Sequence, residues 1–181
     1  MPRYTAFLRA INVGGRVVKM DRLRTLFESL GLANVETFIA SGNVLFDTPA
    51  AKVSSDMLAQ KIERELYRAL GYEVATFLRT GPELAAVAAH RPFDAPDPLP
   101  GGHSLLIGFL NAAPTAEAEQ RLMAYTCATD DFSVHGREVY WWCRGRISDS
   151  RFTGARLEKA LGLPTTMRNV TTVRRLVSRQ P

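Results

Sequence analysis

The order of apolar runs along the chain constrains its fold more than any other feature. Over the first 80 residues, β-rich runs and amphipathic stretches follow one another as strand, helix, strand, strand, helix, strand, and the same order starts again at His103. This is the order of a ferredoxin-like unit. The sequence therefore predicts an α+β protein in which two ferredoxin-like halves pack together.

The boundaries of the predicted elements come from apolar spacing and from residues that begin or end helices. In the first half we expect strands at 4–9, 35–39, 44–47 and 74–79, and helices from Met20 to Gly31 and from Ser54 or Ser55 to Gly71. In the second half we expect strands at 104–110, 132–134, 138–143 and 165–168, and helices from Thr115 and from about Ser150 to Gly162. A terminal helix is predicted at 170–177.

A proline-rich passage separates the two halves. It follows a short helix predicted to start at Thr80-Gly81-Pro82, and it holds prolines at 92, 96, 98 and 100 before Gly101-Gly102. Such density of proline and glycine is typical of a connection. We therefore assign 1–80 to an N-terminal half, 81–102 to a helix and linker, and 103–181 to a C-terminal half.

The ferredoxin-like pattern also predicts which strands are neighbours. We expect the order 4-1-3-2, with the first and third strands adjacent and parallel. The end of the first strand, near Asn12, and the turn Ser41-Gly42-Asn43 would then lie at opposite edges, so nothing requires these loops to meet. Large apolar residues at 7–8 and 45–46 predict that both faces of the sheet are covered, one by helices and one by the other half.

Charge is distributed unevenly along the chain. The net charge is +5, but residues 1–30 hold six Lys/Arg and two Asp/Glu, and residues 144–181 hold nine and two, so the middle is acidic. If the ends come together, their positive field suits phosphate, nucleic acid or an acidic metabolite; otherwise the arginines merely solvate helix faces. With no signal-like start and no apolar run of membrane-spanning length, we expect a cytoplasmic protein that does not enter a membrane.

The segment from Arg9 to Arg16 joins the first strand to the first helix through Gly14-Gly15. Paired glycines allow positive φ and close approach of a ligand, while Arg9, Arg16 and Lys19 supply positive charge. Two interpretations remain open, a plain tight connection and a binding loop.

Established catalytic and cofactor motifs are absent from the sequence. It lacks GxSxG, HExxH, GxGxxG and GxxxxGK[ST], its histidines at 90, 103 and 135 are scattered, and Cys127 and Cys143 have no metal-ligand spacing. Adjacent Asp130 and Asp131 would point to opposite faces of a strand, which disfavours an acid/base pair. We therefore expect neither a metal nor a cofactor and assign no catalytic residue. The aromatic run 140–142 is either a stacking platform for bases or a buried strand.

Three separated motifs resemble those of a known family. They are Leu8-Arg9-Ala10-Ile11-Asn12-Val13-Gly14-Gly15, Phe38-Ile39-Ala40-Ser41-Gly42-Asn43-Val44-Leu45-Phe46 and Thr166-Met167-Arg168-Asn169-Val170-Thr171-Thr172-Val173. The chain resembles, over nearly its whole length, the bacterial proteins catalogued as domain of unknown function 1697 (DUF1697). The resemblance implies a ferredoxin-like α+β fold and no established activity. This chain departs from the family where it has Ala10 in place of glycine and Val170-Thr171 in place of tryptophan-asparagine.

The candidate ligand-binding residues are those that match the family motifs: Arg9, Asn12, Gly14, Gly15, Ser41, Gly42, Asn43, Arg168, Asn169 and Thr172. The leading hypothesis is a protein that binds, or also acts on, an anionic or phosphorylated small molecule between Arg9 and Arg168. Two alternatives stay open: RNA or DNA binding through the basic terminal segments, and a protein-interaction module without catalysis. The oligomeric state is not predicted.

Overall fold

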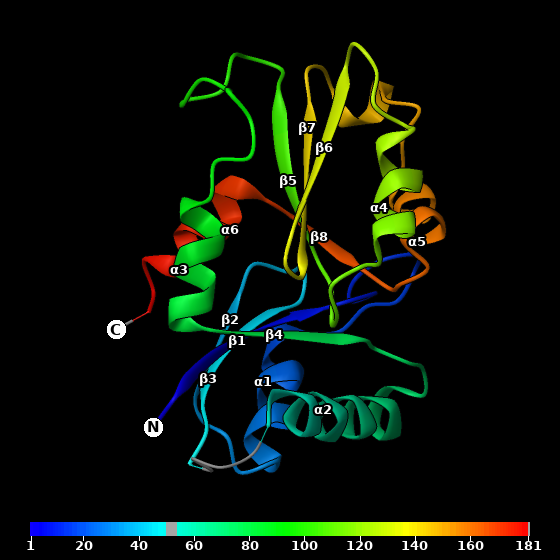
Figure 1. Cartoon of the computed structure of the whole chain (residues 1–181). Coiled ribbons are helices and arrows are strands. Elements are labelled where there is room, and N and C mark those ends of the chain that lie inside the picture. The colour runs from blue at the N-terminus through cyan, green and yellow to red at the C-terminus, as the bar shows by residue number, and fades with distance from the viewer. Residues whose placement is uncertain (50–53, 181) are drawn as a thin grey trace. The chain divides into compact units, whose positions relative to one another are not determined.

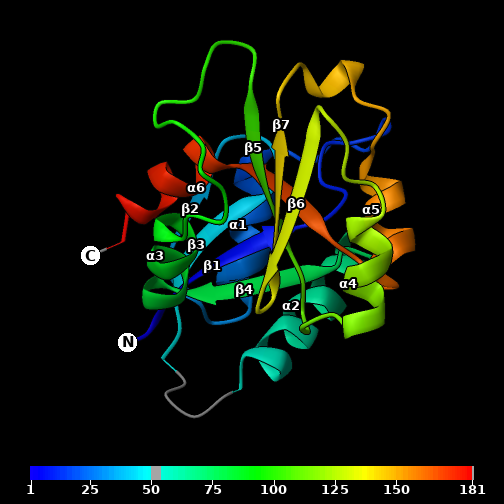
Figure 2. The same ribbon diagram turned by 45° about the horizontal axis from the view of Figure 1, so that its top comes forward.

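Two four-stranded antiparallel sheets form the framework of the chain, which a computed structural model describes for residues 1–49 and 54–180. The chain divides into a first unit, Met1–Ala85 with Leu176–Pro181, and a second unit, Ala86–Arg175. Each unit holds one sheet and the helices that pack on it (Figures 1 and 2). The predicted α+β fold of two ferredoxin-like halves is therefore confirmed.

The elements of the first unit follow the predicted order. They are β1 (Arg3–Leu8), α1 (Met20–Ser29), β2 (Ala33–Phe38), β3 (Asn43–Asp47), α2 (Ser55–Leu70) and β4 (Thr76–Thr80), followed by α3 (Gly81–Ala89), which crosses into the second unit. The strands lie in the order β2-β3-β1-β4, which is the expected 4-1-3-2 arrangement.

The second unit repeats this order. Its elements are β5 (Ser104–Phe109), α4 (Ala116–Met123), β6 (Asp130–His135), β7 (Glu138–Cys143), a 3-10 turn (Ile147–Asp149), α5 (Gly154–Leu161), β8 (Thr166–Asn169) and α6 (Val170–Val177). The sheet order β6-β7-β5-β8 is again 4-1-3-2. Helix α6 begins directly after β8, and its last residues belong to the first unit.

Several predicted helix ends are confirmed by their hydrogen bonds and dihedral angles. The hydroxyl of Ser54 accepts a bond from the Met57 amide at 3.2 Å, and the hydroxyl of Thr115 caps α4 in the same way. Gly71 and Gly162 close α2 and α5 with φ of 79° and 67°, angles that favour glycine.

One helix start was predicted wrongly. The helix expected from about Ser150 begins at Gly154, because Thr153 is the capping residue and its hydroxyl accepts a bond from the Arg156 amide at 3.3 Å. Ser150 is extended, and its hydroxyl donates instead to the Asp130 carboxylate at 3.0 Å. A polar partner 20 residues away thus keeps Ser150 out of the helix.

The predicted direction of the third strand was also wrong. β1 and β3 are adjacent but antiparallel, with Tyr4 opposite Phe46 and Phe7 opposite Asn43. The crossover through α1 returns β2 in the direction of β1, and the tight hairpin then reverses β3. The end of β1 therefore lies beside the start of β3, and the Leu8 amide donates to the Gly42 carbonyl at 2.8 Å.

The core of the first unit lies between its sheet and two helices. Leu23 and Phe27 of α1 and Ile62 of α2 are fully buried, and the Phe27 ring lies 5.5 Å from that of Phe46. Complete burial of such a side chain is worth about 1.5–3 kcal/mol. Phe7, next to this cluster in β1, is also buried.

Helices α4 and α5 pack side by side on the second sheet (Figures 1 and 2). Leu122 and Leu157 from these helices are buried in the same cluster as Trp141. Tyr140, Trp141 and Trp142 are 1%, 2% and 8% exposed. The aromatic run is therefore a buried strand, and it presents no open platform for stacked bases.

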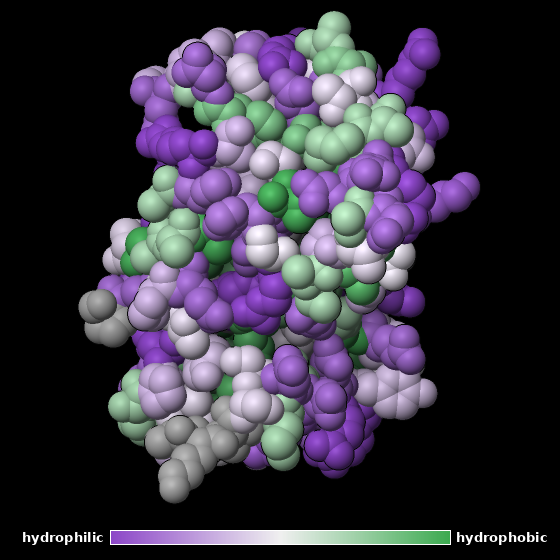
Figure 3. Space-filling model, in the orientation of Figure 1, coloured by the Kyte–Doolittle hydropathy of each residue, from purple (hydrophilic) through white to green (hydrophobic). Residues whose placement is uncertain are grey.

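The surface is predominantly polar where Figure 3 displays it, and apolar residues are dispersed among hydrophilic ones. Within residues 1–49 and 54–180, no helix combines the length and the apolar character that a bilayer crossing requires.

Candidate anion-binding loop

The segment that joins β1 to α1, residues 9–19 and named here the glycine loop, has an unusual backbone. Ala10, Asn12, Gly14 and Gly15 all have positive φ, at 63°, 56°, 61° and 81°. Only glycine adopts such angles freely, and asparagine tolerates them better than other residues. The loop therefore follows a specific path in which four residues have positive φ.

Asn12 fixes that path through its side chain. Its carboxamide oxygen accepts a bond from the Val18 amide at 2.7 Å, which closes the loop on itself. Its nitrogen donates to the Ala40 carbonyl at 2.7 Å and to the Val18 carbonyl at 3.3 Å. Asn12 thus joins both ends of the glycine loop to the turn between β2 and β3.

That hairpin turn, residues 39–42, packs closely on the glycine loop. A Cβ placed on Gly42, where φ is 78°, would lie 3.0 Å from the Cβ of Ile11 and 3.1 Å from that of Leu8. Asn43 closes the turn, since its side-chain nitrogen donates to the Phe38 carbonyl and to the Ser41 hydroxyl, each at 3.0 Å. The structure thus brings together the seven candidate residues of the first unit, in two loops that the sequence did not require to meet.

Ala10 stands where the family resemblance implies glycine, a residue that adopts positive φ without strain. Ala10 nevertheless has φ of 63°. An alanine held at this angle is strained by about 1–2 kcal/mol, so the surrounding bonds impose the conformation.

The glycine pair is open to ligands. Gly14 and Gly15 are exposed, and a Cβ on either would meet no atom within 4 Å. Among the described residues, no group accepts a hydrogen bond from either amide. These two donors are therefore available to a bound group.

The glycine loop is basic. The glycine loop contains Arg9, Arg16 and Lys19 and no Asp or Glu, so its formal charge is +3. Arg16 is held in place by Tyr72, since its guanidinium carbon lies 4.2 Å from the ring centroid. The Tyr72 hydroxyl is buried and has no hydrogen-bond partner in the part of the chain that the structure describes.

The other candidate residues lie where β8 meets α6 in the second unit. The Arg168 side chain is buried, and its guanidinium donates to the Thr166 hydroxyl at 2.7 Å and to the Met167 carbonyl at 2.9 Å. Burial lowers the pKa of Arg168 to about 10. The Asn169 carboxamide oxygen caps α6, since it accepts hydrogen bonds from the amide and the hydroxyl of Thr171. Thr172 is half-buried on that helix.

Among the described acid, histidine and cysteine side chains, the buried carboxylate of Asp130 has structural partners. Asp130 accepts bonds from Trp141, Thr129 and Ser150; burial raises its pKa, but these bonds outweigh that effect and hold the pKa below its usual value. Asp131 pairs instead with Arg144. No group of three or more potential metal ligands is found in residues 1–49 and 54–180.

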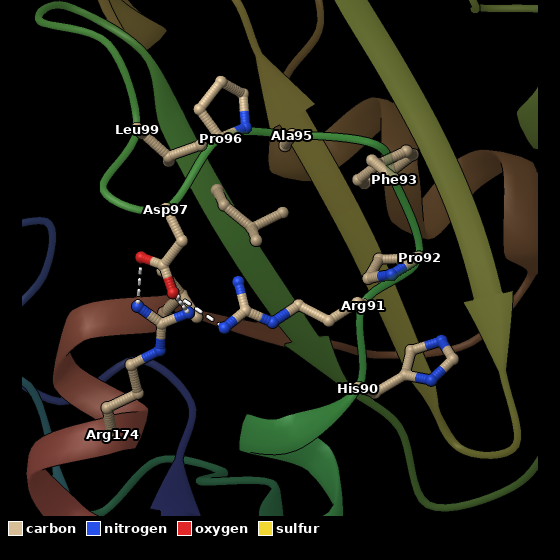
Figure 4. Close-up of a pocket in the computed structure, with 11 residues that line it drawn as sticks. His90, Arg91, Pro92, Phe93, Ala95, Pro96, Asp97, Leu99 and Arg174 are labelled. Atoms are coloured by element: carbon tan, nitrogen blue, oxygen red, sulfur yellow. Dashed lines mark hydrogen bonds and ion pairs between the residues drawn. The ribbon is translucent and has the colours of Figure 1, made fainter.

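Sequence analysis missed one cluster of charged residues. Arg174 of α6 and Arg91 both bind the carboxylate of Asp97, beside a pocket in the second unit (Figure 4). Arg91 and Asp97 lie in the stretch that we interpreted as a linker. The signal in the sequence was the presence of both acidic and basic residues within a proline-rich passage. The pairing could not be predicted because Arg174 is 77 residues from Asp97.

Comparisons with known proteins agree with this fold. A family model described as "Protein of unknown function (DUF1697)" matches residues 1–140. The solved structure of a conserved bacterial protein, SP0830 from Streptococcus pneumoniae, is similar with a TM-score of 0.69 and 22% identity, over 99% of this chain and 98% of that one. At this identity the likeness concerns the fold alone. No curated protein matches the chain.

Proposed function

We propose that this chain, which belongs to the DUF1697 family of proteins of unknown function, binds a small anionic molecule at the glycine loop of its first unit. The observation that carries the proposal is the pair of exposed amides at Gly14 and Gly15, which have no acceptor among the described residues. Successive backbone amides in a turn can form a concave donor site for anionic oxygens.

The charge of the loop supports an anion as the ligand. Arg9, Arg16 and Lys19 contribute +3 without a neutralising carboxylate inside the loop. Arg16 is positioned by its contact with Tyr72, which reduces the entropy that it would lose on binding. Charge-assisted bonds from such groups are stronger than neutral ones.

The size of the donor set suits one phosphate or a similar group. Two amides with the cations Arg16 and Lys19 match the oxygens of a single phosphoryl group better than a long polyanion. The apolar side chains of Val13 and Val17, 62% and 81% exposed, flank the glycine pair and offer contact to an uncharged part of the ligand. A phosphorylated metabolite is therefore the class that we favour.

Nucleic acid has less support. Many arginines of the basic ends already form ion pairs, namely Arg3 with Asp47, Arg24 with Asp21, Arg144 with Asp131, and Arg179 with Glu36. The aromatic run that could have stacked bases is buried. A long phosphate footprint would need cations that are not engaged in this way.

The test is thermal unfolding of the full chain with sodium phosphate, a sugar phosphate or a nucleoside monophosphate, against sodium chloride at equal ionic strength. We expect the phosphates to raise the melting temperature, by an amount that grows with the logarithm of their concentration once it exceeds Kd. Arg16→Gln with Lys19→Gln should remove most of that rise, whereas Arg64→Gln, an exposed change on α2, should keep it. An equal rise in all three proteins, or none in the wild type, would contradict the proposal.

A further inference from the structure

A pocket lies in the second unit, and none of its lining residues belongs to the glycine loop. It is formed under the segment 90–102, named here the proline strap, together with β5 and the first turns of α6 (Figure 4). Its apolar wall consists of Pro92, Phe93, Leu99, Leu105 and Val170. The hollow is a shallow, partly open depression and not an enclosed cavity.

Two guanidinium groups and one carboxylate form the polar end of the pocket. Arg174 donates from its two terminal nitrogens to the two Asp97 oxygens, each at 3.0 Å, and Arg91 lies 2.7 Å from one of the same oxygens. These bonds, first from Arg174 and then from Arg91, hold the pKa of Asp97 below its usual value, so the carboxylate is charged. The three side chains together carry a charge of +1.

The two arginines are therefore arranged around a planar, two-oxygen anion. A bidentate arginine with a second guanidinium on the same group is how proteins commonly recognise carboxylates. Here the carboxylate belongs to the chain itself and occupies the place that a ligand's carboxylate would take.

Asp97 lies on a segment with few backbone hydrogen bonds. The proline strap forms neither helix nor strand. From Arg91 to Gly102, the described structure contains one backbone-to-backbone hydrogen bond, in which Pro100 accepts from His103 at 3.0 Å. Arg174, by contrast, is on a regular helix. Arg91 and Asp97 both lie on the strap, so Arg174 is the fixed member of the ion cluster and Asp97 can move away from it.

We propose that this pocket binds a small monocarboxylic acid with an apolar body, whose carboxylate displaces Asp97 from Arg174 and Arg91. The apolar body contacts Phe93, Leu105 and Val170, and Asp97 moves into water. Asp97 is then a built-in competitor that lowers the apparent affinity of the site by the fraction of time that it occupies the arginines.

The test is a titration of the full chain with benzoate and with cyclohexanecarboxylate, in which binding is monitored by the backbone amide resonances in nuclear magnetic resonance spectra. Benzamide serves as the neutral analogue. Asp97→Asn removes the competing charge, and we expect it to bind the acids about tenfold more tightly than the wild type, by the same competition argument. Adding Arg174→Gln to Asp97→Asn should abolish binding, and benzamide should not bind. Asp131→Asn, which removes an equivalent partly exposed carboxylate paired with Arg144, should leave the affinity unchanged.

The proposal is overturned if Asp97→Asn binds no acid, binds it no more tightly than the wild type, or binds it equally after Arg174→Gln. Inorganic phosphate that competes as well as benzoate would overturn the carboxylate class. Because Arg16→Gln alters the glycine loop alone, it should not affect these titrations, so this site and the one in the first unit succeed or fail separately.

Discussion

The side-chain nitrogen of Asn12 donates a hydrogen bond of 2.7 Å to the carbonyl oxygen of Ala40. This bond ties the loop after β1 to the turn before β3, and it exists because those strands are antiparallel. The same carboxamide closes the glycine loop through Val18. Asn12 thus fixes the loop that contains the Gly14 and Gly15 amides. We therefore expect both the stability of the chain and the binding of an anion at this loop to depend on Asn12.

Asn12→Ala should destabilise the chain by about 3 kcal/mol, because it removes three hydrogen bonds and places alanine at positive φ. Urea unfolding measures the change. The matched control is Asn34→Ala, since Asn34 also has positive φ (48°) but makes one exposed bond to Asp47. That control should lose about 1 kcal/mol. An equal loss of unfolding free energy in the two variants would show that Asn12 does not join the two loops as described.

Gly42→Ala should cost about 3 kcal/mol, since it adds strain at positive φ and a Cβ 3.0 Å from Ile11. Gly71→Ala has nearly the same φ, 79°, but its Cβ would meet no atom within 4 Å, so we expect a loss of about 1 kcal/mol. The difference between the two midpoints in urea measures the packing of the hairpin turn on the glycine loop. A Gly42→Ala protein as stable as Gly71→Ala would refute that packing.

Ala10→Gly should stabilise the chain by about 0.5–1 kcal/mol, because relief of strain at φ of 63° exceeds the entropy that glycine adds to the unfolded state. Ala85→Gly, an exposed change within α3, should instead destabilise by about 1 kcal/mol. Melting curves of the two variants give opposite shifts on this account. A loss of stability in both would mean that Ala10 is not strained.

Acidification should destabilise the second unit through His90. Burial lowers the pKa of His90, and the stacked His135 ring, 4.1 Å away, lowers it further, although Glu138 acts in the opposite direction. A base with a lowered pKa takes up protons more readily when unfolded, so its contribution is present at high pH and is lost as pH falls through 6.5, the usual histidine value. Urea midpoints from pH 8 to pH 5 test this. The decrease in the urea midpoint between pH 8 and pH 5 should be smaller in His90→Phe than in the wild type. An equal decrease in both proteins would exclude His90 as its cause.

The sequence was sufficient for the architecture and the family. Local signals such as the hydroxyl of Ser54 and the glycine at 162 act within one helical turn, so they could be recognised from the letters alone. The DUF1697 resemblance rested on three motifs, two of which lie within the matched residues 1–140.

The loops could not be predicted in the same way because long-range bonds decide their shape. Ala10 and Ile39 have positive φ, 63° and 50°, against the preference of both residue types, and no local pattern indicates this. Ser150 lies outside its predicted helix because its hydroxyl bonds to Asp130. Asp97 is paired with Arg174, which lies 77 residues away in the sequence. The direction of β3, however, followed from the crossover and the hairpin, so it was predictable and was predicted wrongly.

The most direct test of the central claim follows the amide resonances of Gly14 and Gly15 while phosphate is added to the full chain at constant ionic strength. The account predicts that both resonances shift and saturate together, and that the shifts disappear in the Arg16→Gln, Lys19→Gln double variant. Resonances of Gly31 and Gly71, two exposed glycines that end helices, should stay in place. Saturable binding of phosphate that leaves the Gly14 and Gly15 amides unmoved would contradict it.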